Sequence, residues 1–176
     1  GVYPSSYEGI TLRPFYSLHE CRYMVYWPLL SKEELTARQE KLAREEQERQ
    51  ILDAMTTDKV VCGEQQPESD HFVQMEHSYA GDDEGTHWRE ARGWFSYQMK
   101  TRGQRPAKVR VRFRPDGSRN ALVSLNEVEI GVLDNQPGIA EFEIPVSLRT
   151  SDVLTIKVAK GEKNITPRIY EVRLIK

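Results

Sequence analysis

Hydrophobic and polar residues alternate along most of the C-terminal two-thirds of this chain. Between Lys108 and Arg114, the apolar residues Val109, Val111 and Phe113 take every second position and arginines take the positions between them. A period of two places successive side chains on opposite faces of a β-strand, so the pattern predicts a half-buried strand. The turn residues Pro115-Asp116-Gly117-Ser118 follow directly and predict where this strand ends.

The same pattern returns at intervals typical of an all-β fold. A hairpin is expected where Asn126-Glu127 joins two short apolar runs. Short alternating strands separated by turns indicate an antiparallel sandwich or jelly roll. The sequence therefore predicts a mainly β fold, a sandwich or galactose-binding-like jelly roll, over residues 56–176. The further expected strands are Ala121–Leu125, Val128–Leu133 and Ile139–Val146, with Phe142 and Ile144 inward, followed by the inward rows Leu154, Ile156, Val158 and Tyr170, Val172, Leu174.

The N-terminal part differs from this pattern. Ile10 to Leu30 is rich in aromatic and β-branched residues, which favour a strand. Within Cys21–Trp27 both faces of such a strand are largely apolar, so it needs a cover on each side. We expect residues 1–30 to be the closing strand segment of a preceding β-sandwich. If that domain is absent, Cys21–Trp27 is expected to pack on the C-terminal sandwich or to self-associate.

A helix is predicted from Ser31 to Ala54. Ser31 and Glu34 form a capping box, and no Gly or Pro interrupts the following twenty residues. The apolar residues are few and spread among charges, as in a solvated helix supported by charge pairs. Residues 31–55 are therefore expected to form a bridging helix between domains. A coiled-coil seam is the less favoured alternative, because the heptads are few and polar.

Composition narrows the class of partner. The chain has 176 residues and a formal net charge of -2, so it offers no field for a phosphate backbone or an anionic lipid surface. No apolar run is long enough for a membrane span, and the first residues lack the features of a signal peptide. Neither nucleic acid nor membrane is an expected partner. Cys21 and Cys62 lack zinc-motif spacing and are expected to be free thiols rather than a mutual disulfide.

Candidate chemistry is concentrated in the polar run Gly63–His71. A packed core does not require two amides, three acidic residues and a histidine around a proline, so this run is expected to be a loop with specific partners. Glu64 paired with Glu68 or Asp70 would supply an acid and a base, as in glycosidases, although this spacing fixes no separation. Capping and backbone contacts are the commoner role of such side chains. The binding candidates in this run are Glu64, Gln65, Gln66, Glu68, Asp70 and His71.

A second group of candidates surrounds the strand expected at Gly93–Met99. Phe95, Tyr97 and Met99 should face the core, which places Trp94 on the other face. Trp94 is expected to plug against a loop or a neighbouring domain; a sugar-stacking platform is the alternative. Trp88 and Tyr79, expected in an upstream loop, would extend such a platform. Trp88, Arg89 and Trp94 complete the binding candidates.

Metal binding is not the favoured interpretation. His71, His77 and His87 lie among acidic residues, but they are scattered over an expected loop rather than spaced for zinc. A calcium site is favoured over a zinc site, because calcium accepts carboxylates from irregular loops. No cofactor is expected in this chain. No nucleophile elbow, phosphate-binding loop or dinucleotide fingerprint is present.

Several segments together resemble the C-terminal part of glycoside hydrolase family 127, the β-L-arabinofuranosidase family. The most specific of them is Gly63–His71. The others are Leu12-Arg13-Pro14-Phe15-Tyr16-Ser17-Leu18-His19, Arg22-Tyr23-Met24-Val25-Tyr26-Trp27, Trp88-Arg89-Glu90-Ala91, Gly93–Tyr97 and Tyr170-Glu171-Val172-Arg173-Leu174. The resemblance implies a helical catalytic barrel with a cysteine nucleophile and zinc, followed by β-sandwich domains. Nothing in this chain matches the barrel or its Cys motif, so zinc is expected only there, and the stretch Arg114–Pro145 is shorter than its usual counterpart.

The resemblance implies a role as well as a fold. The chain is expected to be a non-catalytic C-terminal sandwich of a secreted glycoside hydrolase that braces the barrel of the same polypeptide, with the parent periplasmic or extracellular. One alternative is a carbohydrate-binding module that grips plant cell-wall polysaccharide through Trp88 and Trp94. The less favoured alternative is carboxylate-based glycosidase activity in the run Gly63–His71.

Overall fold

A computed structural model describes residues 30–134 and 137–176 and divides the chain into two units, 1–45 and 46–176. The strand expected within residues 1–30, and with it the proposed association through Cys21–Trp27, falls almost wholly outside the described residues. Among the described residues, no helix is long and apolar enough to cross a membrane.

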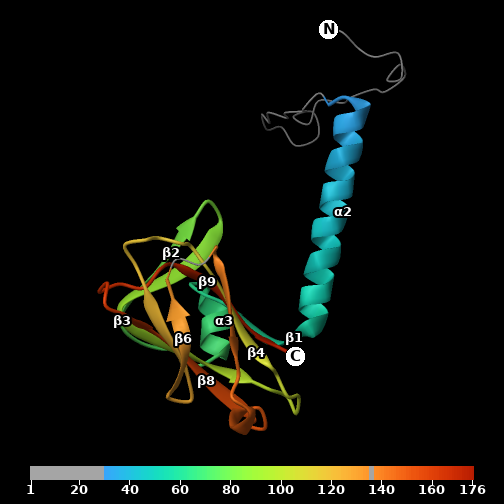
Figure 1. Cartoon of the computed structure of the whole chain (residues 1–176). Helices are drawn as coiled ribbons and strands as arrows, with labels where there is room; N and C mark the ends of the chain where they lie inside the picture. The colour runs from blue at the N-terminus through green and yellow to red at the C-terminus, as the bar shows by residue number, and fades with distance from the viewer. Residues whose placement is uncertain (1–29, 135–136) are drawn as a thin grey trace, which may run out of the picture. The chain divides into compact units, whose positions relative to one another are not determined.

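The predicted helix is present as α2, Lys32–Met55 (Figure 1). The capping box is formed as expected: the Glu34 N–H donates to Ser31 Oγ at 3.1 Å, and the Ser31 N–H donates to Glu34 Oε2 at 2.8 Å. No residue of α2 is buried by the described chain, which agrees with the polar pattern. Charge pairs on its surface include Lys41–Glu45 at 3.8 Å. Exposed pairs of this kind contribute little, so the helix depends mainly on propensity and on its caps.

The unit 46–176 is a mainly antiparallel β structure, as the alternating pattern predicts. Nine strands are present in its described residues, with the short helix α3 near the start (Figure 1). Their bounds are β1 Thr56–Val61, α3 Gln65–Asp70, β2 Gln74–Asp83, β3 Thr86–Lys100, β4 Lys108–Phe113, β5 Ala121–Leu125, β6 Val128–Leu133, β7 Ile139–Glu143, the 3-10 turn η2 Val146–Leu148, β8 Val153–Lys160 and β9 Ile169–Ile175.

The strands form one sheet that curls strongly. Its order is β6-β5-β8-β3-β9-β4-β7, with β1 added beside β9 and β2 beside β3. The two ends of this order approach each other, because a Cβ at Gly131 on β6 would lie 2.2 Å from the ring of Phe142 on β7. Glycine at this position lets the edges meet. The result is a nearly closed, barrel-like sandwich, in which the sheet curls around one hydrophobic core.

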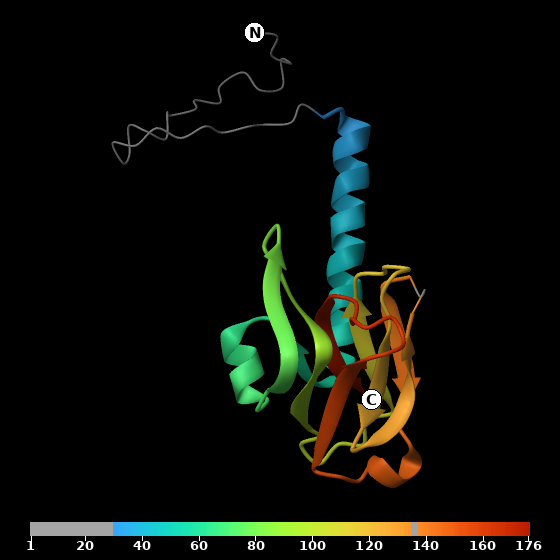
Figure 2. The ribbon, with the colours of Figure 1, turned by 90° about the vertical axis from the view of Figure 1, so that its left-hand side faces the viewer.

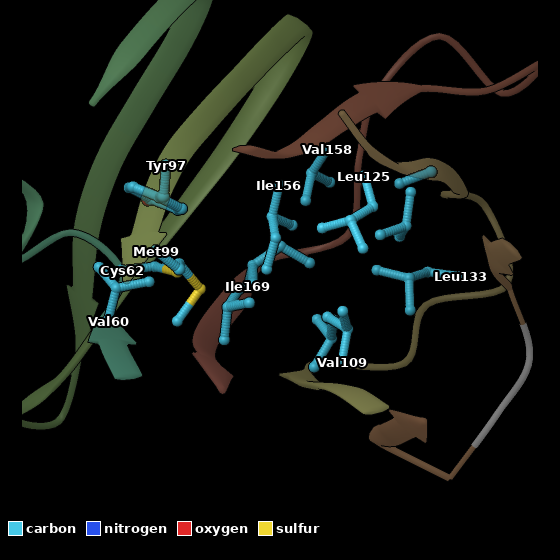
Figure 3. Packing of buried hydrophobic residues seen from close by; sticks show 14 of the residues in the cluster. Val60, Cys62, Tyr97, Met99, Val109, Leu125, Leu133, Ile156, Val158 and Ile169 are labelled. Carbon is cyan, nitrogen blue, oxygen red and sulfur yellow. The ribbon is translucent and has the colours of Figure 1, made fainter. Parts of the chain in front are cut away.

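The inward rows predicted from the sequence make that core. Val109, Val111, Leu154, Ile156 and Val158 are fully buried. Figure 3 shows Val109 facing Leu125 and Leu133 across the interior, with Tyr97, Met99 and Cys62 at the other end of the cluster. Cys62 is a free, buried thiol, in agreement with the prediction for that residue. Burial raises its pKa to about 12, so it behaves as an inert small hydrophobe.

The last inward row differs from the prediction at one position. Tyr170 was expected inside, but it is only half-buried, while its neighbour Ile169 is fully buried. The register between β4 and β9 shifts after Arg112, so that Phe113 pairs with Ile169. This bulge turns Tyr170 outward, where Arg112 lies 5.0 Å from the centre of its ring. A bulge reverses the face of every residue beyond it, which a strict period of two does not anticipate.

One loop prediction and one strand bound were also wrong. Tyr79, His77 and Trp88 were expected in a loop, but they lie on the β2–β3 hairpin, which is closed by Glu84-Gly85. Both turn residues have positive φ, at 52° and 83°, as a two-residue hairpin turn requires. The strand expected over Ile139–Val146 is shorter, because Pro145 starts η2 and the chain leaves the sheet after Glu143.

The turn between β5 and β6 provides a stability prediction. Asn126 and Glu127 have φ of 46° and 69°, and Leu125 pairs directly with Val128. Glycine avoids the cost that a Cβ imposes in this region of φ, so Glu127→Gly is expected to raise the free energy of unfolding by about 0.5–1 kcal/mol. Urea denaturation measures this change. The control is Glu129→Gly within β6, which is expected to destabilise; a loss in both variants would contradict the turn argument.

Candidate functional site

The polar run that stands out in the sequence is a turn followed by a short helix, not the expected loop. Glu64 lies at the N-cap of α3 in an extended conformation, and Pro67 lies within the first turn, where its missing N–H costs no hydrogen bond. The helix ends at His71. Figure 2 shows α3 beside the β2–β3 hairpin. Short-range pattern misses this helix because it has a single turn and only one buried residue, Glu68.

Glu68 is the centre of a buried polar network. Its side chain is 5% exposed and accepts hydrogen bonds from Arg89 Nε to Oε1 and from Arg89 Nη2 to Oε2, both at 2.6 Å. The Tyr97 hydroxyl donates to Oε1 at 2.6 Å, and the Gly63 N–H donates to the same oxygen at 2.7 Å. The bidentate pairing with Arg89 is the strongest common geometry for such a pair. These hydrogen bonds engage both oxygens of a side chain that is almost fully buried, so the carboxylate is not presented to a ligand.

The network sets the charge states of its members. Burial alone raises the pKa of Glu68, but the hydrogen bonds from Arg89 and Tyr97 outweigh it and hold the pKa below its usual value. Burial lowers the pKa of Arg89, and Glu68 more than restores it. Burial, with the nearby Cys62 and Glu68, keeps the pKa of Tyr97 well above its usual value. The network is therefore a permanent ion pair with a neutral phenol, which suits structure rather than proton transfer.

A second polar group lies at the end of α3. His71 Nε2 lies 3.3 Å from Asp58 Oδ2, and His71 Nδ1 lies 2.6 Å from the carbonyl oxygen of Pro67. Asp58, on β1, is nearly buried and also accepts from the Lys100 N–H at 2.7 Å and faces Arg102 at 3.3 Å. These groups border an open hollow of about 430 Å³, whose lining residues are Asp53, Thr56, Thr57, Asp58, Lys59, Asp70, His71, Lys100 and Arg102.

His71 and Asp58 reinforce each other's charge. Because the Pro67 carbonyl accepts the proton on Nδ1, neutral His71 would point a lone pair at the Asp58 carboxylate. Protonation removes that repulsion. The hydrogen bond with Asp58 accordingly raises the pKa of His71 above its usual value. Burial raises the pKa of Asp58, but the hydrogen bonds from His71 and from the Lys100 backbone outweigh this and lower it.

The pair makes stability depend on pH in a defined direction. A raised folded-state pKa means that the contribution of His71 is complete below its unfolded pKa of about 6.5 and is lost as pH rises through the folded pKa. We therefore expect the free energy of unfolding to fall as pH rises from 6 to 8, and this fall to vanish in His71→Gln. Urea denaturation at each pH measures it. His87→Gln is the control, since His87 is half-exposed and 3.9 Å from its nearest acid. An unchanged slope in His71→Gln would contradict the assignment.

The two tryptophans proposed as a sugar platform are covered by neighbours. Arg168 lies 4.2 Å from the ring centre of Trp88, and a Cβ at Gly81 would lie 2.3 Å from the Trp88 ring. The Trp94 N–H donates to Glu76 Oε2 at 2.9 Å, and Lys157 Nζ lies 4.4 Å from its ring centre. Both rings are half-buried. Each tryptophan therefore uses its polar atom or a ring face for contacts within the sheet.

The other candidates do not converge on one point. Glu64 is half-exposed and makes no side-chain cap, while Gln65 and Gln66 are exposed on α3, with Gln66 bonded to Asp70 at 2.8 Å. Among the candidates, Gln66 meets Asp70 on the surface of α3, and Glu68 meets Arg89 in the buried network. Sequence reasoning missed Tyr97 and Gly63 as partners of Glu68, and it missed Asp58 as the partner of His71. A signal was available for Asp58, a carboxylate inside the otherwise strand-like run Thr56–Val61, where an acid is unusual.

Metal ligation has no candidate group in the described parts of the chain, since no three His, Cys, Asp or Glu side chains gather there to hold an ion. His77 and His87 are each near one acid, Glu76 and Asp82, at 3.9 Å.

Comparison with protein families gives a match over most of this structure. The model of a family of unknown function, DUF6805, matches residues 51–175. This chain belongs to the DUF6805 family. The matched span begins in the last turns of α2 and takes in the whole sheet. A different model, described only as a domain of unknown function, DUF4986, matches residues 1–29. No curated protein matches the sequence.

Solved structures resemble this DUF6805 member only weakly. The extracellular domain of ANXUR1 from Arabidopsis thaliana is 16% identical to this chain, with a TM-score of 0.49. The alignment covers 67% of this chain and 41% of the ANXUR1 chain. The plant receptor-like kinase ANX2 is 14% identical, with a TM-score of 0.48, and the alignment covers 66% of this chain and 40% of the ANX2 chain. An exo-β-1,3-galactanase from Phanerochaete chrysosporium is 12% identical, with a TM-score of 0.43, and the alignment covers 68% of this chain and 29% of the galactanase chain. The chain spans less than half of each, and similarity at this level says nothing about ligand or activity.

Proposed function

We propose that this DUF6805 sandwich is a non-catalytic accessory module of a larger secreted glycoside hydrolase resembling the β-L-arabinofuranosidases, and that it braces the catalytic barrel of the same polypeptide. The observation that carries the proposal is the burial of Glu68 within a network of internal partners. Glu68, at the centre of the polar run, accepts four hydrogen bonds from within the sandwich, and its side chain is too buried to face a substrate.

Carboxylate-based glycosidase chemistry uses two carboxyl groups that face each other across a sugar, with one of them protonated or nucleophilic. The only buried carboxylate of the run is Glu68, whose pKa is lowered rather than raised. Asp70 is exposed and bonded to Gln66, and Glu64 is half-exposed. This arrangement favours a structural role for the run over the carboxylate-based alternative.

The junction between α2 and the sheet supports a bracing role. Arg173 on β9 is 8% exposed and contacts Asp53 Oδ1 at 2.5 Å, while Glu171 holds the same guanidinium at 2.6 and 2.9 Å. The Lys176 N–H also donates to the carbonyl oxygen of Met55 at 3.0 Å. The helix end is therefore tied to the last strand. At about 1.5 Å per residue, the 24 residues of α2 make a spacer about 36 Å long, suited to connecting two domains.

The presence of two different family models in one chain also supports a multidomain parent. A module of this kind contributes stability and placement rather than turnover, and the secreted location follows from the class of the proposed parent.

Two measurements test this proposal. The chain, incubated with aryl arabinofuranosides, is expected to release no aryl alcohol above a buffer blank. In the parent polypeptide with its barrel, Arg173→Met is expected to lower the Tm of the barrel and leave the KM unchanged, because the junction loosens while the site is intact. Turnover by this chain that is lost in Glu64→Gln would overturn the proposal. So would a barrel Tm that does not respond to Arg173→Met although the module itself stays folded.

A further inference from the structure

A second hollow, of about 400 Å³, lies away from α3 and is lined by three arginines. Its lining residues are Arg114, Pro115, Asp116, Arg119 and Arg168. They come from the segment after β4 and from the residue just before β9. None of them belongs to the candidates singled out from the sequence.

The guanidinium groups at this hollow are held in place by neighbouring acids. Arg168 Nη1 contacts both oxygens of Asp83 at 2.8 Å, and the group stacks 4.2 Å from the ring centre of Trp88. Arg119 pairs with Glu90 through Nη1 and with Asp116 through Nε at 3.2 Å. Side chains fixed in this way lose little entropy when a ligand binds.

Each arginine nevertheless keeps unused donors. The contacts of Arg114, Arg119 and Arg168 with described residues use Nη1 in all three and Nε in two, so the three Nη2 groups make none. Arg114 is the freest of them, since its side chain is 60% exposed and its one contact, to Asp83, is 3.4 Å long. Two fixed cations and the more mobile Arg114 side chain thus offer N–H groups around one hollow to oxygen acceptors from outside.

The charge balance restricts the class of ligand. Asp83, Glu90 and Asp116 offset the three arginines, so the hollow suits one singly charged carboxylate better than a doubly charged group such as phosphate. The arginine fork matches a single planar carboxylate. The exposed Asp116 can accept hydrogen bonds from hydroxyl groups, and the ring of Pro115 offers an apolar surface. A carboxylate, hydroxyls and a C–H face on one ring describe a sugar acid.

We propose that this hollow, the arginine pocket, binds a uronate unit of an acidic polysaccharide, with Arg114 donating to its carboxylate. This goes beyond the bracing role and differs from the tryptophan platform, because the binding groups are the arginines and Asp116. If the arginine pocket does not bind a uronate, the proposed bracing role still stands, since that role rests on Glu68 and Arg173.

Isothermal titration calorimetry with the galacturonic acid trisaccharide tests the proposal, with neutral galactotriose and inorganic phosphate as comparison probes. We expect saturable heat for the acidic trisaccharide and at least about tenfold weaker binding in Arg114→Gln, the effect of losing one charge-assisted hydrogen bond. Arg105→Gln, an exposed arginine outside the pocket, should bind as the wild type does. Equal melting temperatures for the two variants and the wild type show that the loss is not unfolding.

Several outcomes would overturn the inference. These are no saturable heat with the acidic trisaccharide, equal affinity for galactotriose or for phosphate, and unchanged binding in Arg114→Gln. Binding that is lost in Trp94→Ala but kept in Arg114→Gln would instead assign the site to the surface around Trp94.

Discussion

Glu68→Leu is expected to lower the free energy of unfolding by about 3–5 kcal/mol, because it leaves the guanidinium of Arg89 buried without its partner. Arg89 is 6% exposed, and its other contacts are the Ser78 hydroxyl and the Met75 sulfur, both at 3.1 Å and both uncharged. The Tyr97 hydroxyl and the Gly63 N–H lose their acceptor as well. Urea denaturation followed by circular dichroism measures the loss.

A matched substitution four residues earlier separates this effect from a general effect on α3. Glu64→Leu removes a carboxylate that is half-exposed and makes no cap hydrogen bond, so its cost should stay below about 1 kcal/mol. The double variant Glu68→Leu/Arg89→Leu should recover a large part of the loss, since no buried charge remains. If Glu68→Leu unfolds no more readily than Glu64→Leu, the network does not stabilise the fold and the structural assignment of Glu68 fails.

Gly63→Ala is expected to cost more than about 2 kcal/mol, for two separate reasons. Gly63 has φ of 85°, a region that costs a residue with a Cβ about 1–2 kcal/mol. An added Cβ would also lie 2.4 Å from the carbonyl oxygen of Trp88. Backbone cannot move aside as a side-chain end can, so β3 or the turn must shift, and the Gly63 N–H then moves away from Glu68.

Gly85→Ala isolates the first of these two costs. Gly85 has nearly the same φ, 83°, but an added Cβ would meet no atom within 4 Å. It should therefore lose only the backbone penalty of about 1–2 kcal/mol. The difference between the two variants, measured by urea denaturation, reports the contact with Trp88. Equal losses would mean that the chain absorbs the clash at Gly63 without cost.

Most strands could be predicted from the sequence, because half-burial repeats with the period of the strand itself. β5 and β6 have the predicted bounds, and the inward residues of β4 and β8 are buried as expected. The prediction failed where a local pattern is short or interrupted. α3 has only six residues, β2 has little buried surface, and the bulge at Tyr170 turns this side chain to the other face.

The candidate site shows the same division more sharply. The sequence indicated that Gly63–His71 is unusual and named Glu68 and Arg89 as members of one candidate set. It did not indicate that Glu68 and Arg89 pair, that the Tyr97 hydroxyl donates to the same carboxylate, or that His71 contacts Asp58. The resemblance to the β-L-arabinofuranosidases and the fold segment expected at residues 1–30 stay predictions.

Alternation, the capping box and the turn residues are properties of neighbouring positions, and they determined by themselves that this chain is a mainly β module preceded by a polar helix. The tertiary structure alone decided the roles of its charged residues. Partners such as Arg89 and Glu68, or Arg173 and Asp53, lie 21 and 120 positions apart. Whether a carboxylate binds a ligand or serves as a buried structural group depends on how far it is desolvated and on which hydrogen-bond donors surround it. Distant residues supply both, and only the folded sheet brings these residues together.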